Sequence, residues 1–310
     1  MQINYIEQLR AIINATGWSQ VKLANELGVT FATLNRWLNS HAKPHPAMQK
    51  AIYSLFKEQV GILPLSPAEI KNVLSVLARE KKKHPNIHRL LKENERLQED
   101  FLLELTYNSN AIEGSTLTKK ETESIIFDQA QIADKSYSEH LAATNHAAAL
   151  KMIFAGEFAG KVTEKTVKEL HRIIMQGIRP DAGQYSKHHR AIRGVALTLP
   201  GPEDIQEEMA LWLKRVNQPK EKPIIEHIAK MHAAFEAIHP FGDGNGRVGR
   251  LLMTIQLLNA DYSPAIIEKS RKAEYYEVLE YAQRKSETHL VKFVAECVQK
   301  GYQIIRKHKK

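Results

Sequence analysis

Apolar residues recur at every third or fourth position along most of this 310-residue chain, and no other feature of the sequence constrains its fold as strongly. The spacing is clear in YIEQLRAIINAT (5–16), EIKNVLSVLARE (69–80) and PIIEHIAKMHAAFEAI (223–238), and it also runs through residues 87–112. Such spacing gives each segment one apolar face when it winds into an α-helix. The sequence therefore predicts an all-α fold.

One segment departs from this pattern. HHRAIRGVALTLPGP (188–202) is short, carries β-branched residues and closes on Pro-Gly-Pro, which predicts a small β-hairpin. The prolines and glycine of GILPLSP (61–67) are typical of a linker. We therefore expect three parts, at about 1–60, 61–115 and 116–310.

Charge and cysteine content narrow the function classes. A net charge of +9 favours an anionic partner such as a nucleic acid, a membrane surface or a nucleotide, with a merely basic surface as the alternative. Cys297 is the only cysteine, so no intramolecular disulfide can form, which fits a reducing compartment. No apolar run approaches a membrane span and no signal peptide is evident. We expect a cytoplasmic protein with no membrane partner.

Residues 18–39 predict two short helices joined by a tight turn. Ser19 and Thr30 are placed to cap them, and Gly28 is placed to end the first in a left-handed conformation. The segment resembles the helix-turn-helix of phage-repressor-like bacterial regulators. The resemblance implies a phosphate contact from Gln20 and a face toward the DNA major groove formed by Thr30, Phe31, Ala32, Asn35 and Arg36. The alternative is a module that serves only docking or dimerisation.

The stretch HPFGDGNGRVGR (239–250) runs directly into the apolar sequence LLMTIQLL. Backbone N–H groups at the start of a helix are free to bind an anion, and glycine lets the anion come close. Gly244, Asn245 and Gly246 therefore predict a nest of donors. Arg247 and Arg250 share one helical face, which suits a polyphosphate.

Two further side chains of this stretch add chemistry to the predicted phosphate site. Asp243 is a candidate ligand for Mg²⁺, which proteins usually hold with one or two carboxylates and substrate oxygens. His239 is a candidate general base because its ring exchanges a proton near neutral pH. The combination suggests transfer of part of a nucleotide to an acceptor hydroxyl.

The same stretch matches in full the signature of the Fic family, His-Pro-Phe-x-acid-Gly-Asn-Gly-Arg-x-x-Arg, and the similarity covers about residues 115–300. The resemblance implies an all-α domain that transfers AMP from ATP to a Tyr, Thr or Ser hydroxyl of a target protein, or of itself, and releases diphosphate. It implies that His239 deprotonates the hydroxyl, that Asp243 holds Mg²⁺, and that Asn245 lies near the α-phosphate. Gly244 and Gly246 would complete the anion hole, and Arg247 and Arg250 would hold the β- and γ-phosphates.

The resemblance also implies a nucleoside pocket and a flap. Tyr275 and Tyr276, in RKAEYYEVLEYA, would line the pocket. The hairpin at about Ile192–Leu199 would position the target as an added strand, with Val195 beside the nucleotide. Ser186 departs from the pattern, since many members carry arginine after the Gly-x-Tyr turn.

SNAIEGS, which begins at Ser109, matches the inhibitory pattern of Fic proteins through Ser109, Glu113 and Gly114. The resemblance implies that Glu113 pairs with Arg250 and so takes away the partner of the γ-phosphate. In some members this glutamate also helps water to remove AMP. The alternative reading is an ordinary helix end with a solvated Glu113.

The preferred hypothesis is thus an autoinhibited protein adenylyltransferase with an N-terminal module for DNA or a partner. One alternative is a Fic protein that removes AMP or transfers another nucleotide-derived group. Another is a DNA-binding regulator that senses ATP without transfer. The sequence leaves the target, the operator and the oligomeric state open, with a homodimer among the alternatives.

Overall fold

The computed structural model describes residues 4–62, 65–191, 198–218 and 223–308. These residues contain fifteen α-helices, one 3₁₀ helix and no β-strand, which confirms the predicted all-α fold. Most of the predicted hairpin, Val195 included, lies outside the described residues. In the part of the chain that is described, no helix is long and apolar enough to cross a membrane.

The chain divides into two compact units, Met1–Ser66 and Pro67–Lys310. The first unit consists of four helices around its own apolar core: α1 (Tyr5–Thr16), α2 (Gln20–Glu26), α3 (Phe31–Leu38) and α4 (Pro46–Gln59). Ser19 and Thr30 accept hydrogen bonds from backbone N–H groups of α2 and α3, as predicted. Gly28, with φ of 67°, makes the left-handed turn between these helices. Leu23, Leu34 and Trp37 bury the faces on which α2 and α3 meet.

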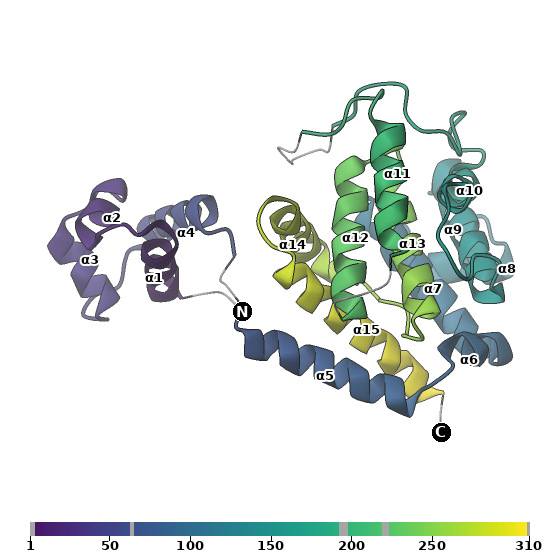
Figure 1. Ribbon diagram of the computed structural model, residues 1–310, viewed down its shortest axis with the longest axis horizontal. Helices are drawn as coiled ribbons and strands as arrows, with labels where there is room; N and C mark the ends of the chain where they lie inside the picture. Colours follow the sequence, from purple (N-terminus) through teal and green to yellow (C-terminus); the bar gives the residue numbers. More distant parts are fainter. Residues whose placement is uncertain (1–3, 63–64, 192–197, 219–222, 309–310) are drawn as a thin grey trace. The chain divides into compact units, whose positions relative to one another are not determined.

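The second unit contains the remaining helices (Figure 1). They are α5 (Pro67–Lys83), α6 (Ile87–Glu93), α7 (Glu95–Ile112), α8 (Lys119–Asp128), α9 (Tyr137–Ala155), α10 (Glu164–Met175), α11 (Ile205–Val216), α12 (Ile224–Ile238), α13 (Asn245–Asn259), the 3₁₀ helix η1 (Lys269–Arg271), α14 (Lys272–Arg284) and α15 (Thr288–Lys307). α13 lies at the centre, in contact with α7, α9, α10 and α12. Nearly all its residues are buried, so the loop that enters α13 is fixed against the core.

The segment 87–112 is two helices rather than the continuous one that its periodicity suggests. Asn94 leaves the helical conformation, with φ of −123° and ψ of 95°, and its side chain accepts a hydrogen bond from the N–H of Leu97. An asparagine side chain that satisfies a backbone donor favours such a helix start over a helix interior. α7 begins here and packs against α9, which brings its C-terminal end toward α13.

Candidate active site

The loop between α12 and α13 presents free backbone donors at the centre of the second unit. His239 ends α12 with φ of 50°, and Gly244 precedes α13 with φ of 79°. A Cβ on Gly244 would lie 2.9 Å from the sulfur of Met175, so only glycine fits there. The N–H groups of the first α13 residues have no carbonyl one turn earlier. Asn245 and Gly246 therefore supply donors at the predicted nest, whereas the N–H of Gly244 donates to Oδ1 of Asp243.

Asn245 holds this loop in shape with its side chain. Its Oδ1 accepts a hydrogen bond from the N–H of Phe241 at 2.9 Å, and its Nδ2 donates to the carbonyl of Phe241 at 2.8 Å. The side chain is 1% exposed. Asn245 therefore offers an anion its backbone N–H, because both polar atoms of its amide are engaged within the loop.

His171 braces the same loop from α10. Its ring stacks on Phe241 at 3.7 Å, its Nδ1 accepts from the N–H of Gly183 at 2.8 Å, and its Nε2 lies 3.1 Å from the carbonyl of Asp243. These partners place the proton on Nε2. Burial lowers the pKa of His171 to about 4, so the ring is neutral at pH 7. The sequence analysis did not assign His171 a role.

His239 lies between two hollows of the surface. One is a cavity of about 100 Å³ that it shares with Arg250, Tyr275 and Tyr276, and the other is an open groove of about 550 Å³. Burial lowers the pKa of His239, and this outweighs the nearby Glu236 carbonyl, which would raise it. A neutral imidazole is the form that accepts a proton.

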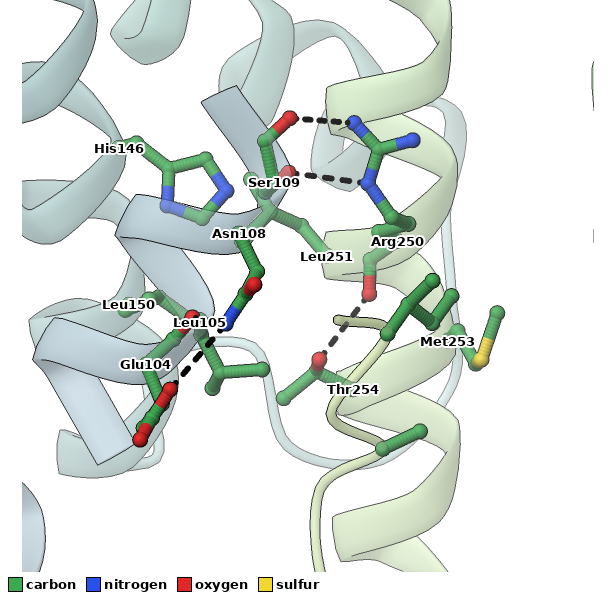
Figure 2. Close-up of a pocket in the computed structure, with 12 residues that line it drawn as sticks. Glu104, Leu105, Asn108, Ser109, His146, Leu150, Arg250, Leu251, Met253 and Thr254 are labelled. Carbon is green, nitrogen blue, oxygen red and sulfur yellow. Dashed lines mark hydrogen bonds between the residues drawn. The ribbon is translucent and has the colours of Figure 1, made fainter. Parts of the chain in front are cut away.

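Arg250 is held by the end of α7. Its Nε donates to Oγ of Ser109 and its Nη2 to the carbonyl of Ser109, both at 3.0 Å. Figure 2 marks both bonds with dashed lines. Nη2 also lies 2.7 Å from Oε1 of Glu113. Burial alone would lower the pKa of Arg250, but the Glu113 carboxylate raises it overall. The guanidinium is thus buried and charged, and it pairs with Glu113, which lies 137 residues earlier in the sequence.

The Glu113 carboxylate occupies the space directly above the nest. A Cβ on Gly246 would collide with Oε1 of Glu113 and lie 3.0 Å from Nη1 of Arg250. Glycine at 246 therefore lets a carboxylate reach the N-terminus of α13. Gly114 follows with φ of 104°, a left-handed turn that ends α7 and leaves Glu113 pointing back to Arg250.

A small cavity of about 20 Å³ lies beside Arg250, with lining residues from α7, α9 and α13. Figure 2 draws these residues. Ser109, His146 and Arg250 are among its lining residues. Burial lowers the pKa of His146 to about 3, with Arg250 adding to the effect. His146 is therefore neutral beside Arg250. The positive charge of Arg250 is balanced by the carboxylate of Glu113.

Arg247 and Asp243 form the outer part of the loop. Nη2 of Arg247 lies 3.6 Å from Oδ2 of Asp243, and Oδ1 of Asp243 accepts a hydrogen bond from the N–H of Gly244 at 2.7 Å. The Asp243 side chain is 56% exposed, so it is open to a cation. The described residues include no group of three or more metal-binding side chains. A single open carboxylate fits a Mg²⁺ that takes its other ligands from phosphates and water.

Tyr275 and Tyr276, the two residues expected at a nucleoside pocket, line the cavity beside Arg250. The hydroxyl of Tyr275 lies 2.7 Å from Nε2 of His232, and its ring is 6.0 Å from the Arg250 guanidinium. Glu236 lines the same cavity and was also missed by sequence reasoning. Its buried Oε1 has no hydrogen-bond partner among the described residues.

Comparisons with known proteins agree with this arrangement. The model of the Fic/DOC family matches residues 161–257, which include α10, α12 and the loop into α13. The chain carries a Fic domain. A helix-turn-helix family model matches residues 9–52.

Relatives of the Fic domain include the protein adenylyltransferase Fic of Drosophila persimilis, 31% identical over 210 residues, and that of Drosophila melanogaster, 32% identical over 209 residues. Each match covers 66% of this chain and about two fifths of the relative (41% and 42%). Similar solved structures include a Fic domain containing signaling protein from Bacteroides thetaiotaomicron, with a TM-score of 0.64, 23% identity and coverage of 74% of this chain and 95% of that one. Fic-1 from C. elegans gives a TM-score of 0.67 at 22% identity, covering 93% of this chain and 85% of that one. At 23% and 22% sequence identity, these two solved structures support the fold of the chain and nothing beyond it.

The helix-turn-helix presents some of its predicted DNA contacts more freely than others. Gln20, Phe31 and Arg36 are exposed, with Phe31 at 47%. The hydroxyl of Thr30 caps α3, and the side-chain oxygen of Asn35 accepts a hydrogen bond from Asn39. Among the predicted contacts outside α2, Phe31, Ala32 and Arg36 therefore have the freest side chains.

Proposed function

We propose that this chain transfers AMP from ATP to a hydroxyl of a target protein. The observation that carries the proposal is a neutral His239 beside an N-terminal nest, two buried arginines and a cavity lined by tyrosines. The target oxygen attacks the α-phosphorus, and the bond from this phosphorus to the oxygen that bridges to the β-phosphate breaks. His239 takes the hydroxyl proton, and diphosphate leaves with the bonding electrons.

The charges of the site match the charge that develops in this reaction. Negative charge grows on the α-phosphate oxygens and on the leaving diphosphate, where the nest and Arg247 stabilise it. Asp243 would hold Mg²⁺, which neutralises phosphate charge when it is bound. The proposal matches the names of the Drosophila relatives, which are protein adenylyltransferases.

The proposal includes autoinhibition by Glu113. Its carboxylate pairs with Arg250 at 2.7 Å and fills the approach to Gly246. A phosphate cannot share this guanidinium and this space with a carboxylate, because like charges repel and the volumes overlap. Bound ATP must either displace Glu113 or leave its γ-phosphate without Arg250.

Transfer of the label from α-labelled ATP, with Mg²⁺, to the purified protein and to proteins of a cell lysate tests both AMP transfer and autoinhibition. Glu113→Gly is expected to label strongly and the wild type weakly. Adding His239→Ala should lower the labelling rate by about 10²–10⁴-fold, the usual contribution of a general base. Glu113→Gln is the matched control, which keeps the shape of the side chain and loses the charge. Equal rates for wild type and Glu113→Gly would contradict autoinhibition. Absence of both transfer and ATP binding in every variant would contradict the whole proposal.

The helix-turn-helix supports a second proposed activity, binding to DNA. The match over residues 9–52 and the exposed Phe31 and Arg36 on α3 favour it. Binding that weakens steeply with salt and is lost in Arg36→Ala would support it, since phosphate contacts release counterions. ATP-dependent DNA binding without AMP transfer would instead favour an ATP-sensing regulator. Release of AMP from a modified target would favour an enzyme that removes AMP.

A further inference from the structure

An open groove of about 550 Å³ adjoins His239. Residues 179–191, which follow α10, line most of it, and Gly242 completes it on the side of the loop. Among the described residues, the groove and the cavity beside Arg250 share His239 and no other lining residue. A group seated in the groove therefore meets the candidate base from a direction different from that of the nucleotide.

The described lining of the groove carries two basic side chains, Lys187 and Arg190, that pair with no acidic residue of that lining. Lys187 is exposed and takes part in no ion pair among the described residues. Arg190 donates to the carbonyl of Pro200 at 2.8 Å, and its buried Nε has no hydrogen-bond partner in the described part of the chain. Asp181 is the one acidic residue in the described lining, and Arg179 already binds it through two hydrogen bonds of 2.7 and 2.9 Å.

The ring of Tyr185, the one tyrosine in the described lining of the groove, is occupied. The ring of Tyr185 packs against Phe241 at 5.4 Å, and Nζ of Lys168 lies over it at 4.4 Å from the ring centre. Single-stranded nucleic acids are usually held by free aromatic faces on which bases stack. Tyr185 therefore offers no free face to a base, and the basic side chains of the lining favour carboxylates.

We propose that this groove binds an acidic stretch of the target protein, and so favours hydroxyls that are flanked by Asp or Glu. The inference rests on the proposed AMP transfer, because His239 receives the proton of a hydroxyl that is bound here. Complementary charge accelerates encounter and selects partners, and its effect falls with salt. Lys187 and Arg190, which line the groove and not the nucleotide cavity, select targets by attracting their acidic residues.

Binding of fluorescent peptides to the full chain tests the groove apart from catalysis. Three peptides share a central threonine and differ only in flanks of Asp, Asn or Lys. The Asp peptide is expected to bind tightest and to weaken as salt rises from about 50 to about 300 mM. Lys187→Glu should weaken it by about 5-fold or more, and Lys187→Gln by less. Lys151→Glu, a charge reversal of an exposed lysine on α9, is the matched control and should leave binding unchanged.

The outcomes separate this inference from the function on which it rests. Equal binding of the three peptides, or an equal loss in Lys151→Glu, would overturn the acidic groove. Tighter binding of a single-stranded oligonucleotide of equal charge, lost in Lys187→Glu, would overturn it in favour of nucleic acid. If Glu113→Gly transfers no AMP while the Asp peptide still binds through Lys187, the transfer proposal fails and the groove stands. If Glu113→Gly labels proteins while the three peptides bind with equal affinity, the acidic-target inference is wrong and the transfer proposal stands.

Discussion

At the scale of single residues, Glu236 makes the strongest prediction for pH dependence. Burial raises its pKa to about 8 from an ordinary 4.5, with Glu113 adding to the effect and Arg250 opposing it. Between these two pH values the folded protein holds a proton that the unfolded chain releases. The free energy of unfolding therefore falls as the pH rises through this window.

Glu236→Gln removes this titration. The variant should gain stability relative to wild type as the pH rises from about 5 to about 8, by on the order of 1 kcal/mol per pH unit. Urea unfolding at several pH values measures the difference. Glu123→Gln, at an exposed position on α8, is the control and should follow the wild-type curve. Parallel curves for Glu236→Gln and wild type would show that Glu236 is ionised in the folded protein.

Asn245 makes a prediction that separates stability from activity. Asn245→Ala leaves the buried Phe241 N–H unpaired, which costs about 1–3 kcal/mol. Asn217 is a matched control, because its side chain also pairs with one residue through both atoms, accepting from the N–H of Val162 at 2.9 Å and donating to its carbonyl at 2.7 Å. Both alanine variants should lose stability in urea unfolding. In the Glu113→Gly background only Asn245→Ala should also lose AMP transfer, and an equal effect of both on transfer would refute the role in the loop.

These residues also show what a sequence pattern reveals at this scale. The loop from His239 to Arg250 stood out because glycine, acid and arginine are unusual together at the start of an apolar helix. His171 and Glu236 did not stand out, because each occupies an unremarkable position in a helical pattern. Their chemistry depends on neighbours that only tertiary structure supplies, such as Phe241 above the ring of His171.

At the scale of elements, the turn after α7 depends on α9. Oε1 of Glu139 accepts hydrogen bonds from the N–H of Thr116 at 2.7 Å and from its hydroxyl at 2.9 Å, while Glu139 also completes the capping box of α9 with Ser136. Partial burial would raise the pKa of Glu139, but these hydrogen bonds lower it to about 2. Its stabilising effect is therefore present above about pH 4.5 and lost as the pH falls toward 2.

Glu139→Gln should destabilise the protein by on the order of 1 kcal/mol at pH 7, since the side chain is partly solvated. The difference from wild type should shrink as the pH is lowered below about 4.5. Thermal unfolding at pH 7, 4 and 3 measures this. Glu123→Gln again serves as the control. A difference that stays constant with pH would show that the carboxylate charge contributes nothing.

Helix ends were predicted well where a single residue determines them. Ser19, Gly28 and Thr30 act in the structure as their residue types suggest. Asn94 was overlooked because the apolar period continues on both sides of it, so that only its capping bond to Leu97 reveals the break. The contact between Glu113 and Arg250 joins elements far apart in sequence and was available only through resemblance to a known motif.

At the scale of the whole molecule, the division falls between Ser66 and Pro67. The composition of residues 61–67 predicts a separate segment over 61–115. In the structure α5 packs along α15, and Oε2 of Glu80 lies 2.6 Å from Nη1 of Arg306. Glu80 and Arg306 are 226 residues apart, and the periodicity of a local segment cannot predict such a contact. Composition therefore indicates the linker but does not reveal that α5 packs on α15.

Because each unit has its own apolar core, the two should unfold separately. Leu34 lies in the core of the first unit and Leu170 in that of the second, both fully buried. Each Leu→Ala change should cost about 2–5 kcal/mol, within its own unit only. Calorimetry should therefore show two transitions, one lowered by Leu34→Ala and the other by Leu170→Ala. AMP transfer in the Glu113→Gly background should survive the first change at temperatures that unfold the helix-turn-helix. A single transition that both changes lower equally would contradict separate unfolding of the two units.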